Sequence, residues 1–370
     1  MLQFSFLQRA IAYRFSFTSS CLIALLCTAN AQTKLLSPNS PELYYQGRIS
    51  RTADAAALTW SGSSVTVHFK GTAIAAILQD TDTANYYNVI VDGKEPFKIH
   101  TETSKKTYAL ATDLPDGNHT VQLFKRTEWT KGKTWFYGFE VPSSTKLLPP
   151  VAAPKRKIEF YGNSITCGYA IEDSSGNDSG KGYFENNYRS YAAVTARHFN
   201  AQYSCIARSG IGIMVSWFPQ IMPEMYNLTE GGDSTSTWDF SQYTPDVVVV
   251  NLFQNDSWIV KLPKNKEFKH RFDTTAPSEK TIIESYRNFV KTIRSKYPKA
   301  RIICALGSMD ATKKGSPWPG YVERAVQQLH DLKIYTLFFD YKGTAGHPNV
   351  AEQQIMANSL IGFIKKKIKW

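Results

Sequence analysis

Four residues, each placed after an apolar run, could together carry out acyl transfer. Ser164 follows the run 158–161 and the turn residue Gly162, at a point where a helix could begin. The dipole and the free N–H groups at the start of a helix favour negative charge, so a serine there is well placed to be a nucleophile. The alternative interpretation is an ordinary N-cap serine after a strand.

Acyl transfer also needs a base and donors for the oxyanion. His347, near the other end of the chain, supplies an imidazole, whose ordinary pKa is near ~6.5. The backbone N–H groups of Ser164 and Gly210 and the side-chain amide of Asn255 could form the oxyanion hole. A glycine suits position 210 because the backbone must come close to a substrate. Taken singly, Gly210 would be a loop glycine and Asn255 a turn or cap residue; taken as a set, they favour an oxyanion hole.

The elements that must position these residues alternate between strand and helix patterns from Lys157 onward. The nearly continuous apolar run 246–250 is typical of a strand buried on both faces. Such alternation predicts a parallel sheet with helices on both sides, with sites at the C-terminal ends of its strands. All four candidate residues follow such strand ends. The expected strands are 157–161, 201–206, 246–252, 301–306 and 335–339, and the expected helices lie around 189–199, 279–296, 318–330 and 349–367.

Residues 42–142 are predicted to be all-β. Turn signals such as Asp92-Gly93 separate short runs rich in β-branched and aromatic residues. Several short strands at this spacing indicate a sandwich or jelly roll. The composition of 143–156 indicates a linker, and 157–370 is expected to form the second domain. The strand candidates are 65–69, 73–78, 87–91 and 120–124.

Residues 1–31 are predicted to be a secretory signal peptide. Arg9 and Arg14 form a basic start, the apolar stretch 15–27 follows, and 29–31 (Ala-Asn-Ala) fits a small-x-small cleavage site. The apolar stretch is too short for a membrane anchor, and no later segment is predicted to cross a bilayer. We expect a secreted or periplasmic protein, cleaved after Ala31.

Composition and charge exclude several classes of protein. With 42% hydrophobic and 20% charged residues, the chain is globular rather than disordered. Its net charge is +12 at pH 7, yet no nucleic-acid-binding module accompanies that charge. We therefore expect a solvated basic surface and no nucleic-acid partner.

The cysteines beyond the signal peptide are expected to be free. Cys167, Cys205 and Cys304 are odd in number and lack close pairs, which does not indicate a disulfide framework. Cys205 and Cys304 lie in apolar runs typical of a core. Cys167 is a rival nucleophile to Ser164, but only the shared helix start favours it.

With these blocks in this order, the chain resembles the SGNH (GDSL-type) hydrolases. The Gly-Asn-Ser-Ile-Thr block at 162–166 and the His-Pro-Asn block at 347–349 carry the resemblance. The added β-sandwich makes the chain similar to carbohydrate esterase family 2. The resemblance implies a three-layer α/β/α fold of flavodoxin type and a carboxylic ester hydrolase that removes O-acetyl groups from polysaccharides of the xylan or glucomannan type. It also implies no metal and no organic cofactor.

Three positions depart from the pattern of the resembled superfamily. Asn163 stands where Asp is usual, Phe253 where Gly is usual, and Thr344 where the acid of an Asp-x-x-His motif is usual. No carboxylate is therefore expected at the usual place behind His347. We expect a Ser-His dyad working through an acetyl-enzyme, with the Thr344 hydroxyl or a neighbouring carbonyl near Nδ1. Asp256 is expected to brace a loop.

Several residues near the strand ends are candidates for substrate binding. The aromatic side chains of Trp217 and Trp258 could stack on sugar rings or simply pack. Phe253 could shape the pocket floor, and Met309 could line the pocket. The insertion 171–188 could form a loop over the site. Two alternatives stay open: a lipase or thioesterase for other acyl esters, and an inactive carbohydrate-binding protein.

Overall fold

The computed structural model describes residues 32–370, so the predicted signal peptide, residues 1–31, lies outside the described residues. Residues 33–370 form one unit. Within the described range, no helix combines the length and apolar character that crossing a membrane would require.

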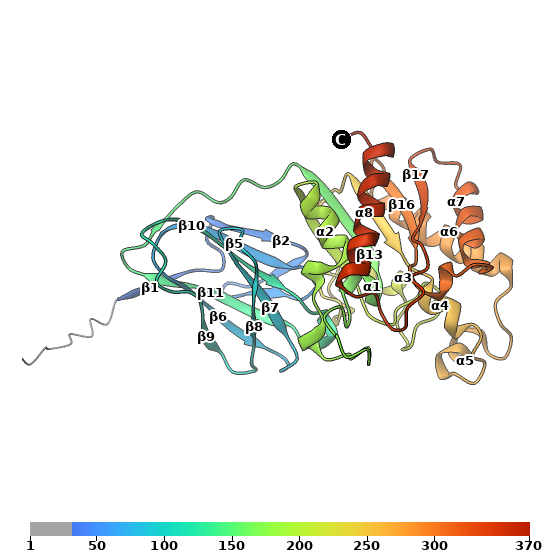
Figure 1. Ribbon diagram of the computed structural model, residues 1–370, viewed down its shortest axis with the longest axis horizontal. Helices are drawn as coiled ribbons and strands as arrows, with labels where there is room; N and C mark the ends of the chain where they lie inside the picture. The colour runs from blue at the N-terminus through green and yellow to red at the C-terminus, as the bar shows by residue number, and fades with distance from the viewer. Residues whose placement is uncertain (1–31) are drawn as a thin grey trace, which may run out of the picture. The chain divides into compact units, whose positions relative to one another are not determined.

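The N-terminal part is a sandwich of two antiparallel sheets (Figure 1). Its strands are β1 (Thr33–Leu36), β2 (Leu43–Gln46), β3 (Ile49–Arg51), β4 (Ala56–Leu58), β5 (Ser64–Gly71), β6 (Ile74–Asp80), β7 (Tyr86–Val91), β8 (Phe97–His100), β9 (Lys106–Ala111), β10 (Gly117–Lys125), β11 (Thr134–Pro142) and β12 (Lys146–Leu147). One sheet has the order β3-β4-β11-β6-β9, with β1 paired to β11. The other has the order β12-β5-β10-β7-β8, with β2 paired to β5.

Alternation of side chains explains the sandwich. In β6, buried and half-buried residues alternate, so one face of the strand enters the apolar layer shared by both sheets. The strands extend past the expected range 42–142: β1 precedes it, and β12 lies within 143–156, the segment expected to be a linker, and pairs with β5.

The C-terminal part is an α/β domain built on one parallel sheet of order β14-β13-β15-β16-β17, which confirms the flavodoxin-like fold. Its strands are β13 (Arg156–Gly162), β14 (Ala201–Ala207), β15 (Val247–Asn251), β16 (Arg301–Leu306) and β17 (Ile334–Phe338). Its helices are α1 (Ser164–Cys167), α2 (Tyr191–His198), α3 (Met222–Met225), α4 (Gln254–Ile259), α5 (Lys266–Phe272), α6 (Glu279–Lys296), α7 (Trp318–Gln327) and α8 (Val350–Lys367). The short 3₁₀ helices are η1 (Trp129–Lys131), η2 (Gly182–Phe184), η3 (Asn187–Arg189) and η4 (Asp310–Thr312).

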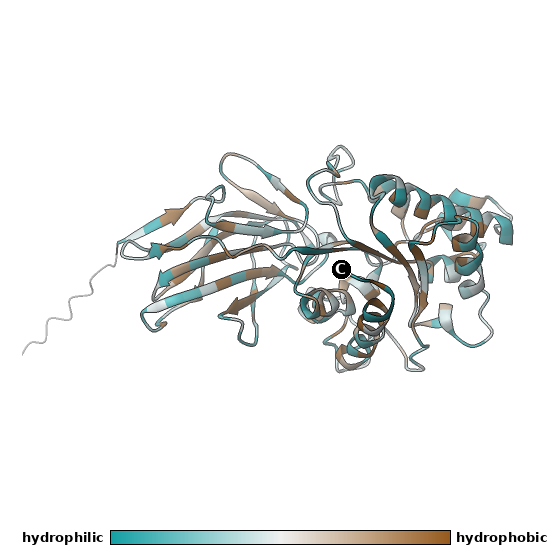
Figure 2. Ribbon diagram, turned by 90° about the horizontal axis from the view of Figure 1, so that it is seen from above, coloured by the Kyte–Doolittle hydropathy of each residue, from teal (hydrophilic) through white to brown (hydrophobic). Residues whose placement is uncertain are grey.

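Helices cover both faces of this sheet because its strands are apolar on both sides. In β15, Val248 and Val250 pack in the apolar layer under α6 and α7, whereas Val247 and Val249 pack in the layer under α2 and α8. Figure 1 shows the two helix pairs on opposite sides of the sheet. Figure 2 shows brown, apolar stretches along the strands and teal, polar stretches on the helices.

A buried ion pair joins the sandwich to the α/β domain. Arg48, on the loop between β2 and β3, places Nη2 3.2 Å from Oε1 of Glu159 in β13, and both side chains are fully buried. Arg48 Nη1 also donates to the carbonyl oxygens of Tyr226 (2.7 Å) and Leu228 (2.8 Å). The sandwich therefore docks through a fully enclosed guanidinium whose Nη1 and Nη2 have acceptors on the other domain, whereas its Nε has no hydrogen-bond partner among residues 32–370.

Candidate active site

Ser164 is the first residue of α1, directly after β13. The Asn163 side chain caps this helix by accepting the N–H of Ile165 at 3.0 Å. The sheet changes direction between β13 and β15, and ligands of such sheets bind in the crevice at that point. Only 6% of Ser164 is exposed, so the hydroxyl lies in a sheltered position at the switch point.

His347 lies on the loop between β17 and α8, beside the serine. Its Nε2 is 2.8 Å from Oγ of Ser164, and the ring packs on Tyr169 with a centroid distance of 4.6 Å. Because Nδ1 faces a carboxylate, we assign the ring proton to Nδ1, which leaves Nε2 to accept the serine O–H. Two residues 183 positions apart thus have the geometry that a nucleophile and its general base require.

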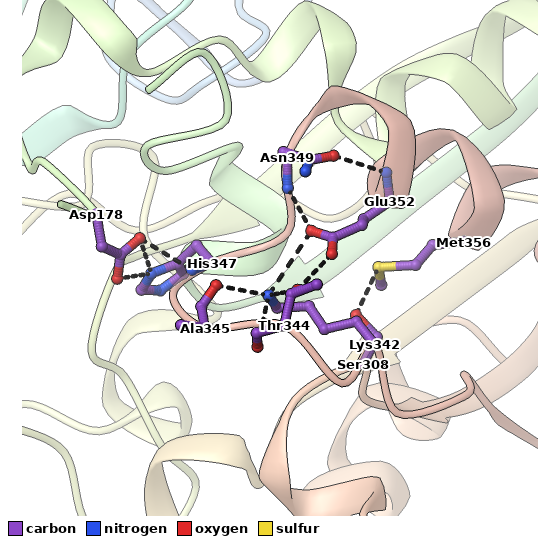
Figure 3. Close-up of polar contacts among 9 residues, drawn as sticks. All are labelled: Asp178, Ser308, Lys342, Thr344, Ala345, His347, Asn349, Glu352 and Met356. Carbon is purple, nitrogen blue, oxygen red and sulfur yellow. Dashed lines mark hydrogen bonds and ion pairs between the residues drawn. The ribbon is translucent and has the colours of Figure 1, made fainter. Parts of the chain in front are cut away.

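The expected dyad without an acid does not match this geometry. The carboxylate of Asp178, from the insertion 171–188, lies 2.7 Å from Nδ1 of His347 and also accepts the His347 backbone N–H at 2.9 Å. Thr344 turns away, and its hydroxyl contacts Lys342 and Glu352 instead (Figure 3). The prediction missed the acid because it comes from a segment far from the histidine motif.

The charge of Asp178 is stabilised where it lies. Partial burial opposes the charged form, but the hydrogen bonds from His347 and the electrostatic attraction of that side chain outweigh burial and hold the pKa of Asp178 below its usual value. Lys342 adds a smaller effect in the same direction. Asp178 is therefore a carboxylate that can accept the Nδ1–H of His347.

The expected oxyanion donors lie at the neighbouring strand ends. Gly210 follows β14 with φ of +84°, a conformation that side-chain-bearing residues rarely adopt. Within residues 32–370, the N–H groups of Gly210 and Ser164 have no hydrogen-bond acceptor. Asn255, in α4 and 3% exposed, uses one amide hydrogen on the Ile211 carbonyl at 2.8 Å and keeps the other. Three donors are thus available for a developing negative charge.

The loop after Gly210 is braced by a buried carboxylate. Asp256 accepts the backbone N–H groups of Ile213, Met214 and Val215 at 2.7 to 3.2 Å. Burial raises the pKa of Asp256 to about 6, although these N–H groups oppose the rise. The expected role of Asp256 as a loop brace is confirmed.

The expected substrate-binding residues take different places. Phe253 is fully buried between Tyr286 and Trp318, so its expected role in the pocket is wrong: the side chain belongs to the core. Met309 is half-buried against the layer beneath α2 and α8. Trp217 is 43% exposed and donates its indole N–H to Oδ1 of Asn255 at 3.1 Å.

Trp258 is half-buried, and its indole N–H donates to Asp310 at 3.1 Å. Of the two tryptophans expected to bind substrate, Trp217 is therefore the one that has an exposed ring and contacts Asn255, a candidate oxyanion donor.

Cys167 does not compete with Ser164. It is fully buried, and burial raises the pKa of its thiol well above the ordinary value, so the reactive thiolate is disfavoured. Cys205 and Cys304 are also buried, and all three are free, as expected. Among the described residues, no group of three His, Cys, Asp or Glu side chains could hold a metal ion.

Sequence reasoning missed a second acid near the site. Glu128, between β10 and η1 in the sandwich and 1% exposed, accepts the backbone N–H of Ser209 at 2.7 Å, next to Gly210. No local motif marks Glu128, because its partner lies 81 positions away. Asp178 carried a weak signal only, as one of several acids in a polar insertion.

Ser164, Gly210, Asn255 and His347 thus follow β13, β14, β15 and β17 of one flavodoxin-like sheet, in the order and positions that define the SGNH class of hydrolases. The family model described as carbohydrate esterase 2 N-terminal matches residues 45–150. A solved family two carbohydrate esterase from Clostridium thermocellum, in complex with cellohexaose, is 34% identical with a TM-score of 0.77. That alignment covers 88% of this chain and 99% of the other. The chain belongs to carbohydrate esterase family 2 and is a carboxylic ester hydrolase.

Two curated relatives extend the comparison. The cellulase/esterase CelE of Acetivibrio thermocellus is 36% identical over 352 residues, which is 90% of this chain but 40% of CelE. The chain thus spans less than half the length of that relative. An acetylxylan esterase / glucomannan deacetylase of Cellvibrio japonicus is 25% identical over 350 residues, covering 92% of this chain and 93% of that protein.

Proposed function

We propose that the protein is a secreted serine esterase that removes O-acetyl groups from a plant-type polysaccharide such as xylan or glucomannan. The observation that carries the proposal is the 2.8 Å approach of His347 Nε2 to Ser164 Oγ at the switch point of the sheet. The names of the Cellvibrio japonicus relative and the membership in carbohydrate esterase family 2 support the substrate class.

The proposed reaction has two halves that use the same groups. Ser164 Oγ attacks the acetyl carbonyl while His347 Nε2 takes the serine proton, and the negative charge forms on the carbonyl oxygen. The N–H groups of Ser164 and Gly210 and the amide of Asn255 stabilise that oxyanion. His347 then gives the serine proton to the sugar oxygen as the bond between that oxygen and the acetyl carbon breaks, which releases the free sugar hydroxyl and leaves the acetyl group on Ser164. In the second half, His347 activates a water that hydrolyses the acetyl-serine and releases acetate.

The exposed ring of Trp217 supports a sugar substrate over a long acyl chain. Its indole N–H is engaged with Asn255, which holds the flat face of the ring beside the oxyanion candidates. Such a face can stack on a pyranose ring. We propose that Trp217 contacts the sugar that carries the acetyl group.

The experiment measures acetate release from acetylated xylan and glucomannan, together with hydrolysis of aryl esters of increasing chain length. Wild type should prefer acetyl esters and polysaccharide, while Ser164→Ala and His347→Ala should lose at least about 1000-fold in kcat. Cys167→Ala is the matched control at the same helix start and should keep its activity. Normal rates in Ser164→Ala, or a clear preference for long acyl chains, would defeat the proposal.

A further inference from the structure

We propose that Asp178 is the acid that positions His347, and that the β-sandwich holds the insertion that carries this acid. The inference rests on the proposed function, because it concerns a group that acts through the catalytic histidine. It assigns the sandwich a part in the chemistry of the other domain.

The contact between Asp178 and His347 is built from both sides. The carboxylate of Asp178 lies 2.7 Å from Nδ1 of the imidazole and accepts the backbone N–H of His347 at 2.9 Å. It therefore fixes both the ring and the main chain of His347. Gly346 permits this approach: its φ is +69°, and a Cβ there would lie 3.3 Å from the carboxylate carbon. A neighbouring side chain would crowd the acid.

Lys342, the cation on the histidine loop, has partners of its own. Lys342 donates to the carbonyl oxygens of Thr344 at 3.1 Å and Ala345 at 2.9 Å, and its Nζ lies 3.7 Å from the Glu352 carboxylate (Figure 3). The ring of His347 packs on Tyr169. Within residues 32–370, the carboxylate within hydrogen-bond distance of Nδ1 is therefore that of Asp178.

The insertion is folded to present the acid. Asp173 accepts the backbone N–H groups of Ser175 at 2.9 Å and Ser179 at 2.7 Å, which closes a turn around Asp178. Asp178 itself has φ of +54°, in the left-handed region that non-glycine residues seldom occupy.

Side chains of the sandwich bind the insertion at positions before and after Asp178 in the sequence. Lys131, in η1, donates from Nζ to the carbonyl of Gly180 at 2.8 Å, two residues beyond the acid. Arg126, which directly follows β10, forms an ion pair with Glu172 and donates from Nε to the carbonyl of Glu185 at 3.2 Å. Because the side chain of Arg126 is 4% exposed, this anchor is shielded from solvent. The sandwich therefore holds the insertion at positions before and after the acid.

The first test replaces the acid by its neutral isostere. Asp178→Asn should lower kcat at least about 100-fold with little change in KM, because the amide cannot stabilise an imidazolium in the orientation needed. Asp178→Glu should recover part of the activity.

A spectroscopic readout separates positioning from folding. An imidazole N–H held by a carboxylate gives a far-downfield proton resonance. That resonance should be present in wild type and in Ser164→Ala, and absent in Asp178→Asn. If Asp178→Asn were unfolded, its thermal unfolding transition would be lost together with the resonance. If it is folded and the acid only positions His347, the transition is kept and only the resonance and kcat are lost.

The second test removes one contact between the sandwich and the insertion, the one nearest the acid, without changing a residue of the site. Lys131→Met should lower kcat by roughly 3–30-fold by letting the acid shift. Lys133→Met is the matched control, because Lys133 lies two residues on and bonds Glu230 rather than the insertion. The control should keep the kcat of the wild type.

The outcomes distinguish this inference from the proposed function. An inactive wild type or an active Ser164→Ala would defeat the proposed function. If Ser164→Ala is inactive but Asp178→Asn keeps the kcat of the wild type, the role of Asp178 is wrong. Equal kcat values for Lys131→Met and Lys133→Met would defeat the role of the sandwich.

Discussion

Asn255 has its amide orientation fixed by two neighbours. The indole N–H of Trp217 donates to Oδ1, which must therefore be the oxygen, and Nδ2 donates to the Ile211 carbonyl. The second amide hydrogen is then held in a defined direction rather than rotating with the side chain. An oxyanion donor of this kind is effective because it is oriented before the charge develops.

Truncating the side chain of Asn255 should lower kcat without preventing the protein from folding. Asn255→Ala is expected to lower kcat by roughly 10²–10³-fold with little change in KM. Trp217→Phe keeps an aromatic ring but removes the orienting N–H, so its loss should be smaller. Steady-state kinetics on an aryl acetate measure both. A change confined to KM would contradict the role of Asn255 as an oxyanion donor.

At the scale of elements, the sequence predicted the sheet well because its signals are local. The apolar run before Asn251 and the helical patterns at 279–296 and 349–367 match β15, α6 and α8 closely. Because Ser164 and His347 both follow predicted strands, the predicted sheet placed them at the same edge. The role of Asp178 could not be predicted, because it depends on the folded path of an insertion held by another domain.

The turn between β15 and α4 shows why a family pattern can mislead. Glycine is usual at position 253, and the structure gives a backbone reason: Phe253 has φ of +82°. The chain satisfies the turn with a strained residue and places its ring in the core between Tyr286 and Trp318. The sequence showed that Phe253 replaces the usual glycine. It did not show whether the consequence would lie in the backbone of the turn or in the position of the side chain.

Replacing this residue sets two effects against each other. Phe253→Gly relieves left-handed strain of about 1–2 kcal/mol, but it removes a fully buried ring worth about 3–5 kcal/mol. The variant should therefore be less stable by about 1–4 kcal/mol in urea unfolding. Phe253→Leu is the control for lost ring volume with the strain kept. A Phe253→Gly protein more stable than wild type would mean that strain dominates.

In the whole molecule, ionisable side chains from both domains are buried where the sandwich meets the insertion. Lys125 from the sandwich and Glu185 from the insertion are both fully enclosed. Burial raises the pKa of Glu185 to about 8, with the nearby Glu128 adding to the rise. Burial likewise lowers the pKa of Lys125 to about 8. The junction therefore favours a neutral carboxyl at Glu185 near neutral pH.

This protonation predicts how stability varies with pH. The pKa of Glu185 is about 8 in the folded protein, against 4.5 as the ordinary value, so the folded state binds more protons between these values. The contribution of Glu185 to the free energy of unfolding is thus fully present below pH 4.5 and declines as the pH rises to 8. Glu185→Gln mimics the neutral acid, so its stability relative to wild type should increase across that window, on the order of a few kcal/mol. Urea unfolding at several pH values measures the difference, and a difference independent of pH would show that Glu185 is ionised in the folded protein.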